Sequence, residues 1–233
     1  ERFLKRPLAA VAGDARVVRL TEVEGVRLLP ARAGGVWATG ERDSSEHGAH
    51  DHHGGDHGET QHDPHAWLDP RNAIAFTQAV AQMLAELDPG NADAYRARAR
   101  ERISALEQLD ERLSERLASV RERPYIVFHD AYQYFEARYG LAARGSITVD
   151  PGRPPGGERL SALRGAIRER GAACVFTEPQ FEPAIARTIV DGTGARLAEL
   201  DPLGAELSPG AALYPKLLAA LAADLRDCLK GAD

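Results

Sequence analysis

The second half of the chain alternates short apolar runs with longer helical patterns, and this alternation restricts the possible folds more than any other feature. Aliphatic and aromatic runs of strand length are each followed by a segment with helical periodicity. Repeated βα units of this length imply an α/β fold with a parallel sheet and helices on both of its faces. The predicted strands cover residues 125–128, 146–149, 174–177 and 196–200, and the predicted helices cover residues 131–139, 158–170, 183–192 and 214–229.

The first half contains two long helical patterns. Residues 72–87 place apolar side chains on one face, and Asp69 and Pro70 suit the N-cap and first turn of that helix. Residues 91–120 form a longer pattern, and about 30 residues of helix span about 45 Å. A helix of that length can run across two lobes, although a coiled-coil-like hairpin with the preceding helix explains the same pattern. Upstream, the sequence indicates a helix end at residues 2–12 and short strands at residues 15–20 and 26–29.

Seven of the eight histidines lie between His47 and Pro70, and the eighth is His129. Imidazole is the commonest neutral ligand for zinc, copper, nickel and iron. Residues 40–62 hold almost no large apolar side chain, so we expect a disordered loop that binds metal weakly and exchangeably. A solvated linker or an expression tag would also be rich in polar residues, but a tag would be terminal and homopolymeric. The histidines of this loop (residues 41–62) are His47, His50, His52, His53, His57 and His62.

The octapeptide at residues 63–70, Asp-Pro-His-Ala-Trp-Leu-Asp-Pro, has a different character. Its two prolines and its apolar residues restrict its shape, so we expect an ordered turn that places His65 in a buried metal site.

Three polar residues, His129, Glu178 and Asp201, each follow directly on a predicted strand. In an open α/β sheet, ligands bind outside the carboxyl ends of the strands, so these side chains should share one edge. A lone histidine after a strand is more often structural, but its companions here favour a ligand. His65, His129 and Asp201 supply two imidazoles and a carboxylate, which suits zinc and leaves a fourth position open. Glu178 can fill that position, orient a ligand, or serve as a helix N-cap before Pro179.

The bulk properties exclude some classes of partner. The chain has 233 residues, a formal net charge of -6 and no clustered basic segment, which argues against nucleic acid as a partner. The sequence contains no run of about 18 apolar residues, so we expect no membrane-spanning helix, and we expect no signal peptide in it. The chain opens in what reads as mid-helix sequence, so we expect that its natural N-terminus was removed or is not represented. Cys174 and Cys228 are either free buried thiols or, in an exported protein, a disulfide.

Four ordered motifs together resemble a known family. Residues 63–70, 128–135 (Phe-His-Asp-Ala-Tyr-Gln-Tyr-Phe), 176–181 (Phe-Thr-Glu-Pro-Gln-Phe) and 200–204 (Leu-Asp-Pro-Leu-Gly) are similar to motifs of the zinc-specific solute-binding proteins of bacterial high-affinity ABC importers. The resemblance covers essentially the whole chain, and the internal histidine-rich loop strengthens it. It implies two lobes joined by one rigid helix, with zinc bound between the lobes. It also implies a periplasmic monomer whose signal peptide has been removed and which docks transiently on an inner-membrane permease.

The same resemblance assigns residues. His65 and His129 would be zinc ligands, Asp201 stands where related proteins have a coordinating aspartate, and Cys174 and Cys228 would form a disulfide. The expected division is a partial N-terminal lobe at residues 1–90, a linker helix at 91–121 and a C-terminal lobe at 122–233. Because the family contributes a further histidine from a region ahead of these residues, the N-terminal lobe would be incomplete, with loop histidines or solvent completing the site.

The leading hypothesis is therefore a protein that captures zinc in the periplasm and hands it to an ABC permease, and not an enzyme. Two imidazoles with a carboxylate favour zinc over manganese, which prefers more oxygen ligands. A zinc hydrolase is an alternative, because the same ligand set occurs in catalytic sites, but the sequence lacks an HExxH motif and offers no base beyond Glu178. A periplasmic zinc buffer or chaperone without a transporter is the other alternative.

Overall fold

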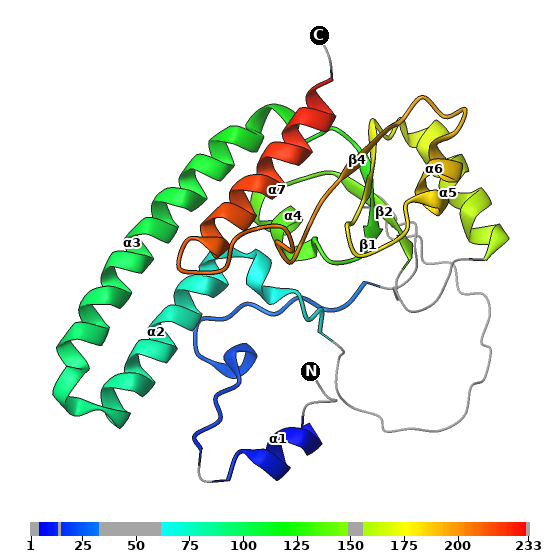
Figure 1. The fold of residues 1–233 in the computed structure, drawn as a ribbon. Helices are drawn as coiled ribbons and strands as arrows, with labels where there is room; N and C mark the ends of the chain where they lie inside the picture. The colour runs from blue at the N-terminus through cyan, green and yellow to red at the C-terminus, as the bar shows by residue number, and fades with distance from the viewer. Residues whose placement is uncertain (1–4, 14, 33–61, 149–155, 232–233) are drawn as a thin grey trace, which may run out of the picture.

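The C-terminal half of the protein is built on a four-stranded parallel sheet (Figure 1). The computed structural model describes residues 5–13, 15–32, 62–148 and 156–231. The strand order is β2-β1-β3-β4, and every neighbouring pair is parallel. This confirms the predicted sheet. The strands are β1 (Tyr125–His129), β2 (Ala143–Thr148), β3 (Cys174–Thr177) and β4 (Arg196–Glu199).

Helices cover both faces of the sheet, as predicted, because successive side chains of a strand point to opposite faces. Ile126 of β1 and Val175 of β3 are buried in an apolar cluster formed with α5 and α6. Tyr125 and Phe176, one residue along each strand, belong to the cluster formed with α3, α4 and α7 on the other face. These helices are α4 (Gln133–Tyr139), α5 (Gly157–Arg170), α6 (Ala184–Val190) and α7 (Leu213–Lys230).

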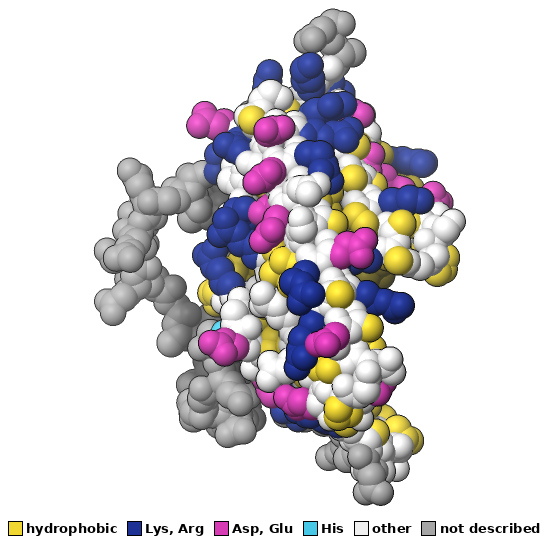
Figure 2. Space-filling model, turned by 90° about the vertical axis from the view of Figure 1, so that its left-hand side faces the viewer, with side chains coloured by type: hydrophobic (Ala, Val, Ile, Leu, Met, Phe, Trp, Pro, Cys, Tyr) yellow, Lys and Arg dark blue, Asp and Glu magenta, His cyan; other side chains and the backbone are white. Residues whose placement is uncertain are grey.

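Two long antiparallel helices precede the sheet, α2 (Pro70–Leu87) and α3 (Ala92–Leu117), as the apolar periodicity predicts. Asp69 caps α2, since its carboxylate accepts a hydrogen bond from the backbone N–H of Arg71 at 2.9 Å. The hairpin and the two-lobe helix were alternatives for α3: α3 forms the hairpin with α2, and its passage across two lobes stays a prediction. Its N-terminal half pairs with α2, and its C-terminal half packs on α7 beside the sheet (Figure 1). The outward face of α3 carries interspersed basic and acidic side chains (Figure 2).

The first described segments differ from the prediction. Residues 5–11 form α1 (Lys5–Val11), but residues 15–20 and 26–29 do not form the predicted strands. A strand needs a neighbouring strand to satisfy its backbone, and the backbone of Arg27 is instead satisfied by the Asn72 side chain on α2, at 2.8 and 3.1 Å. Among the described residues, the β-pairing of this region is one antiparallel bridge between Pro30 and His62.

His62 was expected to be disordered, but it lies in that bridge and is exposed. The other expected loop residues, including His47, His50, His52, His53 and His57, lie outside the described residues.

The strand β4 is largely exposed, unlike the inner strands β1 and β3. Arg196, Leu197 and Glu199 are exposed, because β4 is the edge of the sheet and pairs with β3 alone among the described strands. No helix in the described part of the chain is long and apolar enough to cross a membrane.

A disulfide joins Cys174 of β3 to Cys228 of α7, as the family resemblance implies. Both cysteines are buried, and their sequence separation is 54 residues. The bridge therefore fastens the last helix of the chain to an inner strand of the sheet.

Replacing both cysteines with alanine should lower the free energy of unfolding by about 4 kcal/mol, because a cross-link over 54 residues restricts the unfolded chain. Urea unfolding without reductant measures the difference. Reductant should destabilise the natural chain and leave the double variant unchanged. A variant that unfolds at the same urea concentration as the oxidised natural chain would contradict a stabilising role for the bridge.

Candidate metal centre

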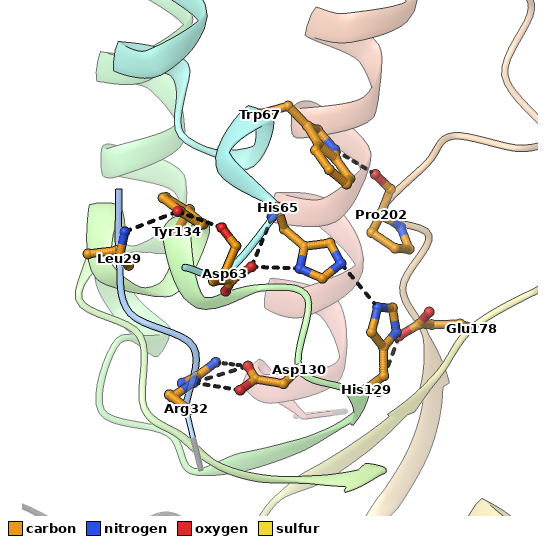
Figure 3. Close-up of polar contacts among 10 residues, drawn as sticks. All are labelled: Leu29, Arg32, Asp63, His65, Trp67, His129, Asp130, Tyr134, Glu178 and Pro202. Carbon is orange, nitrogen blue, oxygen red and sulfur yellow. Dashed lines mark hydrogen bonds and ion pairs between the residues drawn. The ribbon is translucent and has the colours of Figure 1, made fainter. Parts of the chain in front are cut away.

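The structure brings His65 and His129 together from different parts of the chain (Figure 3). His129 is the last residue of β1, and His65 lies in the turn before a short 3-10 helix, η3 (Ala66–Leu68). Their Nε2 atoms face each other at 3.4 Å. The two imidazoles that were predicted to bind one metal are therefore adjacent.

A buried carboxylate holds each imidazole from the opposite side. The Oδ1 atom of Asp63 lies 2.7 Å from Nδ1 of His65 and also accepts the backbone N–H of His65 at 2.9 Å. Oε1 of Glu178 lies 2.6 Å from Nδ1 of His129 and accepts its backbone N–H at 3.4 Å. The two histidines are thus oriented in the same way, by one oxygen that binds both the ring and the backbone.

These carboxylates determine which ring nitrogen is available for a metal. An ionised carboxylate can only accept, so each Nδ1 carries the proton and each Nε2 presents its lone pair. Two lone pairs that face each other at 3.4 Å need a proton or a cation between them. Two imidazole nitrogens bound to one tetrahedral zinc ion, at about 2.0–2.1 Å each, are themselves about 3.3–3.4 Å apart.

The imidazoles are largely shielded from water. The side chains of His65 and His129 are 18% and 12% exposed, and those of Asp63 and Glu178 are 4% and 1% exposed. The indole of Trp67 lies beside His65, with ring centroids 5.2 Å apart, and donates its N–H to the carbonyl of Pro202 at 3.1 Å. Low exposure strengthens the attraction between a bound cation and the paired carboxylates.

The structure places the two predicted carboxylates differently. Glu178 contacts the ring of His129, which agrees with the orienting role that was one of its predicted alternatives. Asp201 accepts hydrogen bonds from the backbone N–H of Leu203 and the side chain of Gln180, both at 3.0 Å. Among the described residues, no group of three or more His, Cys, Asp or Glu side chains is close enough to hold a metal ion. The role of Asp201 as a ligand remains a prediction.

Two residues that the sequence did not single out support the site. The buried hydroxyl of Tyr134 accepts the backbone N–H of Leu29 at 3.0 Å and donates to the carbonyl of Asp63 at 2.8 Å. Asp63 was assigned only to an ordered turn, although its position two residues before a histidine suits a short-range contact. No sequence pattern links Tyr134 to Leu29, which is 105 residues away.

A buried ion cluster lies below the two imidazoles (Figure 3). The guanidinium of Arg32 binds the carboxylates of Asp130 and Glu136. Burial raises the pKa of Glu136 to about 7, because the loss of hydration outweighs the attraction of Arg32. Near neutral pH, the carboxyl group of Glu136 is therefore partly protonated.

Comparisons with known proteins agree with a metal centre. A family model described as "ZnuA: Zinc-uptake complex component A periplasmic" matches residues 1–228. The "High-affinity zinc uptake system protein ZnuA" of Brucella abortus (strain 2308) is 41% identical over 256 residues, which cover 98% of this chain and 74% of that protein. The protein of the same name from Yersinia pestis is 34% identical, covering 99% of this chain and 73% of that protein.

Solved structures extend the similarity to the fold. A chain described as "Crystal structure of ZnuA" aligns with a TM-score of 0.77 at 26% identity, covering 98% of this chain and 76% of that chain. A ZnuA deletion mutant with bound zinc aligns with a TM-score of 0.71 and the same coverage. The laminin-binding adhesin of Streptococcus agalactiae, in a mutant structure, aligns with a TM-score of 0.66 at 31% identity, covering 75% of this chain and 66% of that chain.

The raised pKa of Glu136 predicts how stability changes with pH. Its folded-state pKa of about 7 exceeds its ordinary value of 4.5, so the folded protein keeps a proton that the unfolded chain loses. The stabilisation by this proton is complete below the ordinary value and is lost as the pH rises through about 7. The free energy of unfolding of the natural chain should therefore fall by on the order of 2–3 kcal/mol between about pH 5 and pH 8 through Glu136. In Glu136→Gln this decrease should be absent, because glutamine does not titrate.

Urea unfolding of the chelator-treated protein at several pH values measures this difference. Glu86→Gln is the matched control, because Arg16 lowers the pKa of this exposed glutamate, so it stays ionised throughout that pH range. Parallel profiles for the natural chain and Glu136→Gln would show that Glu136 does not titrate in the range.

Proposed function

The chain belongs to the ZnuA family, the periplasmic component A of zinc-uptake complexes, and on that premise we propose that His65 and His129 are the zinc ligands with which it captures its cargo. The protein binds Zn²⁺ in the periplasm for high-affinity uptake by an ABC importer, whose permease is its partner. Zinc is the transported substrate of this system and not a resident cofactor.

The observation that carries the site assignment is the pair of facing Nε2 atoms, 3.4 Å apart, each backed by a buried carboxylate at Nδ1. Their separation equals the distance of about 3.3–3.4 Å between two imidazole nitrogens on one tetrahedral zinc ion. A pair of aligned lone pairs is costly without a cation and favourable with one. The pair is therefore suited to bind zinc with little rearrangement of the two rings.

The other predicted site residues have different roles in this proposal. Glu178 acts through His129, because its carboxylate already binds the Nδ1 side of that ring. Asp201 becomes a ligand only if its carboxylate leaves the backbone N–H groups of Leu203 and Ala205 and the side chain of Gln180. The loop histidines, His47, His50, His52, His53, His57 and His62, are auxiliary zinc ligands that bind weakly.

We further propose that the protein acts as a monomer and has no catalytic activity. A zinc hydrolase needs a general base near the open coordination position. Glu178 is the acidic side chain beside His129, and it is 1% exposed and occupied by the Nδ1 contact. A residue in that state orients a ligand and is not placed to activate a water molecule.

Replacing His65 and His129 together with alanine should abolish tight one-to-one zinc binding, because both facing nitrogens are lost. A competitive titration against a zinc chelator measures the affinity and the stoichiometry. Arg16→Gln is the control, since Arg16 forms an exposed ion pair with Glu86 and has no proposed role in zinc binding. Retention of the tight site in the double variant would refute the assignment of His65 and His129.

Deleting residues 43–61, with His62 spared, should leave one tight zinc site and remove additional weak sites. The tight pair lies outside the deleted segment, whereas five of the eight histidines lie inside it. The same chelator competition on both proteins resolves the two classes of site. Loss of tight binding in the shortened chain would make the loop, and not the His65–His129 pair, the main zinc-binding element.

A further inference from the structure

We infer that Arg32 is a positioning residue for the zinc site: it ties the segment that carries His129 to the segment that holds His65, and thereby maintains the separation of the two imidazoles. The inference rests on the proposed roles of His65 and His129. Arg32 is remote from both histidines in sequence and is not a metal ligand. Its role therefore cannot be recognised from the proposed zinc ligands alone.

The contacts of Arg32 on the His129 side are specific. Its Nε atom donates to both carboxylate oxygens of Asp130 at 3.0 Å, and its Nη2 atom also donates to Asp130. Its Nη1 atom donates to Glu136 on α4 at 2.8 Å. This forked geometry is particular to arginine and restricts a carboxylate in direction as well as in distance. Asp130 directly follows His129, so a fixed Asp130 side chain restrains the peptide at the end of β1.

The backbone around Arg32 is fastened to the His65 side. Two residues upstream, Pro30 forms the antiparallel bridge to His62. The carbonyl of Leu29 accepts the backbone N–H of Asp63 at 2.9 Å. Asp63 in turn orients the ring of His65 through its carboxylate.

These contacts form a closed circuit, of which Figure 3 draws the Arg32–Asp130, Asp63–His65 and His65–His129 contacts. Arg32 connects through Asp130 to His129, and through Leu29 and Asp63 to His65. The two facing Nε2 atoms, 3.4 Å apart, are where the circuit closes. If the Arg32–Asp130 contact is lost, the hydroxyl of Tyr134 on α4 still binds the backbone of Leu29 and of Asp63 on the His65 side. The distance between the imidazoles should then vary more widely.

The burial of the cluster makes the link energetically significant. The side chains of Arg32, Asp130 and Glu136 are 21%, 9% and 6% exposed, so water and salt screen their attraction only weakly. Removing one partner of a buried pair leaves the other charge without compensation. Exposed pairs, such as Arg16 with Glu86 at 49% and 46% exposure, contribute much less.

Positioning and simple electrostatics predict opposite effects for the loss of Arg32. Arg32 is a cation near a cation site, and it neutralises Asp130 beside a proposed ligand. If Arg32 acted only through its charge, Arg32→Gln would tighten zinc binding. If it positions His129, the same substitution should weaken zinc binding, because the two imidazoles no longer hold the separation that zinc requires.

The test is a thermodynamic cycle on Arg32→Gln, Asp130→Ala and the double variant, with zinc affinity measured by chelator competition on the full chain. Positioning predicts that each single variant binds zinc about 10-fold more weakly and that the double variant is no weaker than either single variant. A purely electrostatic role predicts tighter binding for Arg32→Gln and near-natural binding for the double variant. That result, or natural affinity in Arg32→Gln, would overturn the inference.

Two further variants control for folding and for charge. Arg16→Gln removes an exposed arginine–glutamate pair far from the site and should leave zinc affinity unchanged. Arg32→Lys keeps the charge but loses the fork, so it should bind zinc with intermediate affinity even if Arg32→Gln does not fold. Natural affinity in Arg32→Lys would refute a role for the forked contacts of Arg32 in positioning His129. Urea unfolding of each variant establishes that the titrated protein is folded.

The roles of the two histidines and of Arg32 can be refuted separately. If His65→Ala and His129→Ala do not weaken zinc binding, the proposed ligands are wrong and the role of Arg32 falls with them. If those variants lose zinc and Arg32→Gln does not, the ligands stand and the positioning role of Arg32 is refuted.

Discussion

The site depends on two buried carboxylates that each hold one imidazole by its Nδ1 atom. Without Asp63 and Glu178, the rings of His65 and His129 could rotate or change tautomer, and their Nε2 atoms would not face each other. The surrounding structure serves to place these carboxylates. The end of β3 brings Glu178 to the end of β1, and the contacts of Leu29 and Tyr134 hold the backbone of Asp63. The sheet and the turn therefore position the two carboxylates, and the carboxylates in turn orient the two imidazoles.

The sequence predicted the sheet well because each inner strand is a short apolar run buried on both faces. Residues 125–128 and 174–177 are almost fully buried, so their apolar character is unbroken and their ends are clear. Residues 15–20 and 26–29 have similar composition but form no strand, because the described residues offer neither of them a neighbouring strand. The composition of a segment shows its tendency to form a strand, but the tertiary structure determines whether a neighbouring strand is present. The strand β4 was predicted from its composition, but its exposure follows from its position at the edge of the sheet.

The site was predictable to the extent that its residues carry distinctive chemistry. Histidine is rare in this chain outside one stretch, so His129 was conspicuous, and the motif around His65 restricted its conformation. Arg32 and Tyr134 were not predictable in this way. Arg32 is one of 29 basic Lys and Arg residues, and its partner Asp130 lies 98 residues away. Residues that act through the placement of others have no signature of their own, so their role becomes visible only when the chain is folded.

The exposed strand β4 has a consequence for the solution behaviour of the protein. The free edge of a sheet offers unpaired backbone groups to any other extended chain and is a common starting point for aggregation. In this protein the edge is only four residues long, and charged side chains, Arg196 and Glu199, stand at its two ends. A second chain would bury these charges and gain few hydrogen bonds. The edge is therefore protected against intermolecular strand pairing, although no element of the described structure covers it as a further strand.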